Sequence, residues 1–282
     1  MKWGQIKSIF IICFLVLDTF LVTQYLNKKN SEPQALPNQE ISSIEDELSR
    51  MNIGYENVPS EAESAAYISA GRYQFTEKDV ESLNNQEVVN EGDMIVSTFE
   101  NPISVPEEAT RNDLSMFLDQ MVLFGDEYTF WNWNEEHNIM LFFQSYNDQT
   151  VYFNKAGMLM VFLNKDHEVE YYAQTRLTNI ELGEEKEMSQ PIETLRSLIR
   201  NNHLYTGDRI SNMQLGFHTL VPLDNGIQVF VPTWEITINK EKTYFVNAID
   251  AQSISRDEEE FIEEVKNNVE TIRQRDTGSD ED

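Results

Sequence analysis

The sequence predicts an α+β protein in which one N-terminal transmembrane helix precedes two packed units, each a helix plus an antiparallel meander. Three observations predict this class. An apolar run of about 21 residues opens the chain. Strand-like segments separated by turn residues follow from residue 128, and a helix followed by strands recurs from residue 189. The recurrence is one of topology, so it predicts two α+β units without requiring sequence identity between them.

The composition excludes several classes of function. The 282 residues are 40% hydrophobic, which suffices for a core, and 49 acidic against 21 basic residues give a net charge of −28. A nucleic-acid binder, or a protein adsorbed to anionic lipid headgroups, needs a basic surface, so neither partner is expected. The single cysteine, Cys13, allows neither an intrachain disulfide nor a thiolate metal cluster.

Residues 1–30 predict a cytoplasmic stub and a transmembrane signal anchor. At about 1.5 Å per residue, the apolar run over 6–26 forms a helix about 31 Å long, close to the thickness of a bilayer core. A cleaved signal peptide would need a small-residue site after Leu17, and a lipoprotein would need small residues before Cys13; neither is present. The flanking lysines only weakly favour a cytoplasmic N-terminus.

Asp18 is the unusual residue of this run. A central Asp costs about 2.5–3.5 kcal/mol on insertion, whereas about thirteen Leu, Ile, Phe and Val residues return about 4–8 kcal/mol. The helix should therefore still insert, with Asp18 contacting another transmembrane helix; the alternative is a protonated Asp that is merely tolerated. The predicted partner-binding face consists of the residues on the Asp18 side of the helix: Phe10, Phe14, Leu17, Asp18, Leu21 and Tyr25.

Four further segments follow the anchor: a linker at 31–39, a first extracellular α+β unit at 40–183, a second α+β unit at 184–254, and an acidic C-terminal helix and tail at 255–282. Helices are expected to start near Ser43, at Thr76, before Leu114 and at Ser189. The predicted strands are 93–99, 128–133, 139–145, 150–153, 158–163, 169–178, 210–221, 227–238 and 243–249.

Two features of these units carry more specific expectations. Pro232 lies inside the predicted strand 227–238, which indicates an edge strand or a bulge because proline cannot donate to a ladder. The C-terminal helix has one narrow apolar stripe, which predicts docking on the domain or on a partner and leaves both open. The stripe consists of Phe261, Val265, Val269 and Ile272.

The chain carries no recognisable catalytic group. None of its four histidines has the spacing of a helical metal site, and no nucleophile elbow, phosphate loop or dinucleotide motif occurs. Glu135 and Glu136 could be drawn as an acid/base pair for glycan hydrolysis, but a solvated acidic face explains them equally well. Trp131 and Trp133 alternate in one strand and could stack on sugar rings or pack in the core. We therefore predict no catalytic residue, no cofactor and no metal.

The opening sequence MKWGQIKSIFIICFLVLDTFLVTQYLNKKN resembles the start of the YycI (WalI) family. The likeness continues over 152–164 and in YYAQT at 171–175. It is clearest in LGFHTLVPLDNGIQVFVPT at 215–233, followed by YFVNAI at 244–249. The resemblance implies a fold of two related α+β units and no enzymatic activity, and it brings no active-site residues.

The resemblance also implies a function. The expected protein is a non-enzymatic, membrane-anchored regulator of the essential sensor histidine kinase YycG (WalK) of the YycFG (WalKR) two-component system, which controls cell-wall homeostasis. It would act with the sister protein YycH through transmembrane-helix and extracellular-domain contacts, alone or as an oligomer. The N-terminus would be cytoplasmic and the C-terminal domain would lie outside the cell membrane. The alternative is a cell-wall glycan-binding or hydrolytic exported protein that uses the Trp131/Trp133 strand.

Overall fold

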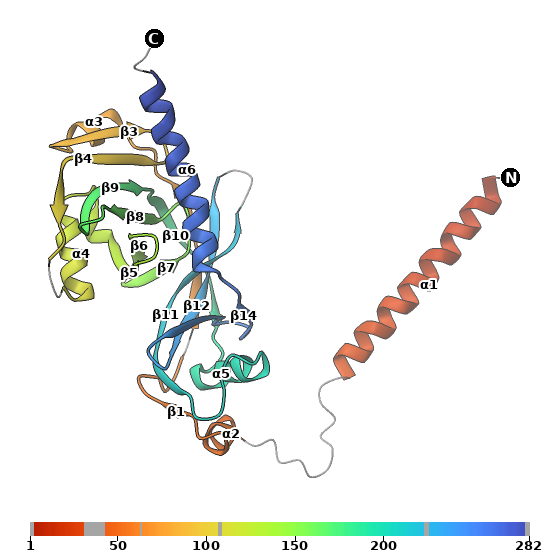
Figure 1. Ribbon diagram of the computed structural model, residues 1–282. Helices are drawn as coiled ribbons and strands as arrows, with labels where there is room; N and C mark the ends of the chain where they lie inside the picture. Colours follow the sequence, from red (N-terminus) through yellow and green to blue (C-terminus); the bar gives the residue numbers. More distant parts are fainter. Residues whose placement is uncertain (1–2, 31–42, 63, 107–108, 223–225, 280–282) are drawn as a thin grey trace. The chain divides into compact units, whose positions relative to one another are not determined.

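The computed structural model describes residues 3–30, 43–62, 64–106, 109–222 and 226–279 (Figure 1). The chain divides into two units, Met1–Glu47 and Leu48–Asp282. The predicted linker at 31–39 lies outside the described residues. The architecture is α+β, as predicted, and it is dominated by a large, mostly antiparallel sheet.

The first unit contains α1 (Trp3–Asn30), a single continuous helix. The hydroxyls of its two threonines are hydrogen-bonded within the helix. Thr19 donates to the carbonyl of Leu15 (2.7 Å), and Thr23 donates to the carbonyl of Phe20 (3.1 Å). No helix within the described residues is long and apolar enough to cross a membrane. The predicted transmembrane span therefore stays a prediction.

The helices after α1 follow the predicted starts with one exception. In α2 (Ile44–Arg50), Ser43 accepts from the amide of Asp46 (3.2 Å). Capping boxes at Thr76 and Thr110 open α3 (Glu77–Glu81) and α4 (Arg111–Asp119), as a Thr followed by Asp three residues later favours. The prediction that Ser189 caps α5 (Pro191–Arg200) is wrong. The N-cap residue is Gln190, which makes no side-chain cap, because the Ser189 hydroxyl instead donates to the carbonyl of Ile249 (3.0 Å).

Fourteen strands among the described residues of the second unit join into one sheet, with a main path in the order β10-β2-β12-β11-β7-β6-β8-β9-β4-β3. They are β1 (Gly54–Tyr55), β2 (Ser64–Arg72), β3 (Gln86–Asn90), β4 (Ile95–Ser104), β5 (Tyr128–Asn134), β6 (Ile139–Tyr146), β7 (Gln149–Tyr152), β8 (Met158–Leu163), β9 (Glu168–Gln174), β10 (Leu177–Glu187), β11 (Arg209–Pro222), β12 (Gln228–Ile238), β13 (Lys242–Asn247) and β14 (Ser253–Ile254).

Two antiparallel meanders lie within the one sheet, and the predicted division into two α+β units stays a prediction. Strands β5, β6, β8 and β9 pair in succession, and so do β11, β12 and β13. A short parallel ladder between β7 and β11 joins the two meanders. Strands β2 and β10, which the sequence analysis did not predict, continue the second meander beyond β12. The boundary predicted at residue 183 consequently falls inside β10.

Pro232 occupies a central strand without breaking it. Along one edge, β12 pairs with β11. Along the other edge it pairs first with β2, through residues 228–230, and then with β13, through residues 233–238. Pro232 lies where the partner changes, and its carbonyl still accepts from the amide of Ala248 (2.8 Å). The missing N–H therefore costs no ladder hydrogen bond.

The C-terminal helix α6 (Glu258–Ser279) docks on the sheet of its own chain (Figure 1). The predicted stripe is buried; Phe261 is 1% and Val269 0% exposed. It packs against a core cluster that includes Phe143 and Phe162 from the sheet. An ion pair between Lys155 and Glu264 (2.6 Å) lies beside this interface. Of the two possibilities left open by the sequence, docking on the domain is the one observed.

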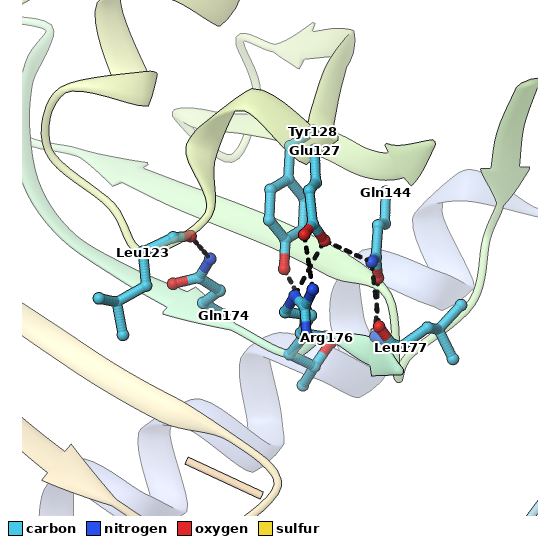
Figure 2. Close-up of polar contacts among 8 residues, drawn as sticks. Leu123, Glu127, Tyr128, Gln144, Gln174, Arg176 and Leu177 are labelled. Carbon is cyan, nitrogen blue, oxygen red and sulfur yellow. Dashed lines mark hydrogen bonds and ion pairs between the residues drawn. The ribbon is translucent and has the colours of Figure 1, made fainter. Parts of the chain in front are cut away.

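A polar cluster fixes the corner where β9 leads into β10 (Figure 2). The guanidinium of Arg176 donates to both oxygens of Glu127, at 2.6 and 2.9 Å, and lies 4.3 Å from the ring centroid of Phe124. Gln144 donates to Glu127 (2.8 Å) and accepts from the amide of Leu177 (2.7 Å). A bidentate, partly buried pair of this kind defines geometry as well as contributing energy.

Replacing Phe261 by Ala tests the docking of α6. The change removes a fully buried ring from the main core cluster, so we expect the free energy of unfolding to fall by about 3–5 kcal/mol. Denaturant unfolding followed by tryptophan fluorescence measures it. The matched control is Asn267→Ala on the exposed face of the same helix, which should change stability by less than about 0.5 kcal/mol. Equal effects of both changes would contradict the docking.

His218 on β11 predicts a pH dependence of stability. Its side chain is 7% exposed, and burial is the main cause that lowers its pKa from the ordinary value of 6.5. Because the folded-state pKa is the lower one, the unfolded chain binds the proton first as the pH falls below about 6.5, which favours unfolding. We expect the wild type to lose more stability between pH 7 and pH 5.5 than His218→Gln does. Parallel losses in two denaturant titrations would rule this out.

Candidate functional site

The predicted partner-binding face lies on α1. Phe14, Leu17 and Leu21 are 59%, 50% and 54% exposed, and Asp18 is exposed among them at helical spacing. The structure thus places these four side chains on one face of the helix. The other two predicted residues, Phe10 and Tyr25, belong to the backbone of α1, but their side chains lie outside the described residues. That this face binds a partner stays a prediction.

The two tryptophans of β5 do not form a joint surface. A bulge at Trp131 breaks the register between β5 and β6, because Phe130 pairs with Phe142 while Asn132 pairs with Leu141. Trp131 consequently packs against the cluster under α6, whereas Trp133 packs against the cluster under α4. Of the two interpretations left open by the sequence, packing against the core is observed for both rings, which remain partly exposed.

A polar cavity that the sequence analysis did not find lies between β5 and the second meander. Its volume is about 710 Å³. One wall is the face of β11, β12 and β13, whose paired residues form two neighbouring rows. The first row is Gln214, Glu235 and Phe245, and the second row is Asn212, Thr237 and Thr243.

Glu235 is the central group of this wall and is only 5% exposed. Its Oε2 accepts from the hydroxyl of Tyr152 (2.7 Å) and from the amide of Gln214 (2.5 Å). Burial, and then the charge of Glu235, raise the pKa of Tyr152 well above 10, so the hydroxyl stays a donor. The Tyr152 ring lies against Gly216, where any Cβ would overlap it, so the glycine is what admits the ring.

The opposite wall comes from β5 and the start of α6. Trp131 donates its indole N–H to Glu258 (2.9 Å), and Asn132 donates to the other oxygen of the same carboxylate (2.8 Å). Arg256 donates to the carbonyl of Phe153 (2.9 Å). These bonds fix the groups that face the meander. The one sequence signal of this site is Glu235, the single charged residue of strand β12.

The two acidic residues and the histidine considered as candidates lie in the turn between β5 and β6. Within the described ranges, no three His, Cys, Asp or Glu residues are placed to hold a metal ion. Glu135 and Glu136 are both exposed, as a solvated acidic face requires. The Nε2 of His137 lies 2.8 Å from a carboxylate oxygen of Glu259, so this histidine links the turn after β5 to α6.

The solved structures that are similar to this chain include three with TM-scores below 0.5. An uncharacterized protein from Eubacterium rectale ATCC 33656 gives a TM-score of 0.43 at 9% identity, covering 72% of this chain and 89% of that chain. The C-terminal domain of Bacillus megaterium YpeB gives 0.36 at 12%, covering 65% and 97%. YycH from Bacillus subtilis gives 0.39 at 13%, covering 68% and 54%. Likenesses of this size carry no argument about function.

Comparison with protein families shows to which family the chain belongs, which the structural similarities do not show. No curated protein matches the chain. The YycI protein family, however, matches residues 32–249, which is most of the chain. YycI proteins are regulators of the YycFG two-component system and not enzymes, so the predicted regulator is supported and the hydrolytic alternative is not. This chain belongs to the YycI family.

Proposed function

We propose that this YycI protein is a membrane-anchored regulator of the sensor histidine kinase YycG (WalK) and acts together with YycH. The observation that carries the proposal is the family match over residues 32–249, which makes the chain a regulator of the YycFG system. The anchor, the direct contact with the kinase and the partnership with YycH are the proposed steps beyond it.

The proposed anchor is α1, with a cytoplasmic N-terminus and the domain outside the cell. What supports it is the chemistry of the helix surface. Nine large apolar side chains between residues 11 and 22 are each at least 50% exposed, which is unfavourable in water over so large a patch. In a bilayer the same apolar surface contacts the hydrocarbon chains of the lipids. Lys7 and Lys28 lie on either side of it in the sequence.

The proposed contact is the Asp18 face of α1. An ionisable side chain in a transmembrane helix is costly to expose to lipid, so it favours a polar partner on a neighbouring helix. A sensor kinase populates at least two arrangements of its own membrane helices. If the Asp18 face binds one arrangement more tightly, it shifts the kinase toward that arrangement by the difference in affinity.

The exported domain supplies specificity in this proposal. Its surface is strongly acidic, since the whole chain carries a net charge of −28. Like charges facing one another across an interface are unfavourable, so this charge excludes acidic partners and favours a partner with basic contact residues. Because α6 is docked on its own chain, its exposed acidic face belongs to this surface and its apolar face does not.

Replacing Asp18 by Leu tests the membrane contact. The change removes the group that needs a polar partner and leaves the domain untouched, so we expect crosslinking in intact host membranes to capture at least about tenfold less YycG. Mass spectrometry of the captured proteins measures this. Thr19→Leu is the matched control on an adjacent face of α1, because its hydroxyl only bonds the preceding turn.

The two ways in which this test can fail have different meanings. Capture of YycG and YycH at wild-type levels by Asp18→Leu would refute the role of Asp18 and move the contact to the exported domain. Absence of YycG from the wild-type capture would refute direct kinase contact altogether. Protein levels must be equal in all three strains, which immunoblotting establishes.

A further inference from the structure

We propose that the polar cavity between β5 and the β11–β13 meander binds a short neutral oligosaccharide. The regulatory function does not assign a ligand to the domain, and this binding site does not depend on the membrane contact proposed above. The argument rests on the size and charge of the cavity, on one unused acceptor, and on the aromatic side chains beside it.

Size and charge favour a neutral ligand. About 710 Å³ lies within the range of about 300–1,000 Å³ typical of small-molecule sites. Three cationic side chains line the cavity, and so do three carboxylates, so the lining is balanced although the chain is strongly acidic. A phosphate or a polyamine would find no excess of opposite charge there. The six residues are Arg111, Lys240, Arg256, Glu235, Glu241 and Glu258.

Glu235 supplies the unused acceptor. Both of its observed hydrogen bonds, from Tyr152 and Gln214, go to Oε2. Its Oε1 accepts none from the described part of the chain, although the residue is 95% buried and lines the cavity. An Oε1 that faces the open cavity is free to accept, so a ligand O–H or N–H placed there makes a charge-assisted hydrogen bond.

The rest of the meander wall suits hydroxyl groups. Asn212 and Gln214 each offer an amide, which both donates and accepts, and Thr237 and Thr243 offer hydroxyls with the same dual capacity. A sugar hydroxyl also donates and accepts at once, so it can pair with any of these four. The wall is the face of a sheet, so it presents side chains to a ligand while its backbone groups pair between the strands.

Aromatic side chains complete the site. Trp131, Phe153 and Phe245 line the same cavity. Because Phe153 and Phe245 are almost fully buried, the partly exposed indole of Trp131 is the ring that can contact the C–H face of a sugar. The indole of Trp131 is held by its hydrogen bond to Glu258 (2.9 Å) and by the neighbouring rings of Tyr152 and Phe153. A rigid aromatic next to fixed polar groups is preorganised for binding.

Titration calorimetry on the full-length protein in detergent micelles tests the proposal. The probes are maltotriose, cellotriose, mannotriose and tri-N-acetylchitotriose, with the neutral peptide Gly-Ser-Gly as the comparison. We expect saturable binding of at least one trisaccharide with a Kd below about 1 mM and no binding of the peptide. Failure of all four sugars to bind up to about 10 mM, or binding of the peptide alone, overturns the proposal.

Variants locate the site. Glu235→Gln removes the charge while keeping the shape, and it should weaken the trisaccharide at least tenfold because a charge-assisted hydrogen bond becomes a neutral one. Thr243→Val deletes one hydroxyl from the wall and should weaken binding about threefold to tenfold. The matched control is Thr98→Val on β4, outside the cavity, which should leave the Kd unchanged.

These variants also separate binding from folding. Thermal melting of each protein shows whether Glu235→Gln still folds, and Thr243→Val provides a second test because the residue is β-branched in either form. An unchanged Kd in Thr243→Val together with an unchanged Kd in folded Glu235→Gln would show that the sugar binds elsewhere. That result overturns the assignment even if binding to the wild type is strong.

Discussion

The parallel ladder between β7 and β11 is the constraint on which the second unit depends. Only two residue pairs form it, Val151 with Phe217 and Tyr152 with His218, yet it connects the two meanders. It holds because Gly216 leaves room for the ring of Tyr152, whose hydroxyl then reaches Glu235. Tyr152 belongs to the core under α6 and its hydroxyl holds Glu235 in the wall of the polar cavity, so one side chain connects the two meanders.

Local sequence patterns predicted most of the regular structure. The strand at 158–163, apolar on both faces, is β8 at the predicted bounds, and all six of its residues are buried. The stripe from Phe261 to Ile272 also docks as its spacing predicts. These elements could be predicted because the information lies within about ten consecutive residues, where periodicity decides which face is buried.

The features that were missed depend on contacts between distant residues. Strands β2 and β10 are rich in alanine and acidic residues, and their pairing spans more than 100 positions, which periodicity does not reveal. The bulge at Trp131 reverses the direction of the next side chains without any proline or glycine to mark it. The cavity was missed for the same reason, since Glu235 and Tyr152 are 83 residues apart. The grouping of the α1 residues on one face, by contrast, could be predicted from helical spacing alone. The cost of a central Asp18 in a membrane is what makes this face a predicted contact.

The position of α6 has a consequence for the order in which the chain can fold. A chain is made from its N-terminus onward, and the cluster around Phe143 keeps an open apolar face until residues 261–272 have been synthesised. Strand β2 has both of its partners far downstream, with β10 more than 100 residues later and β12 more than 150 residues later. The pairs among β5, β6, β8 and β9 can form earlier, because their residues are close in sequence. The core is completed only when α6 has been made, so the last residues of the chain control the final step of folding.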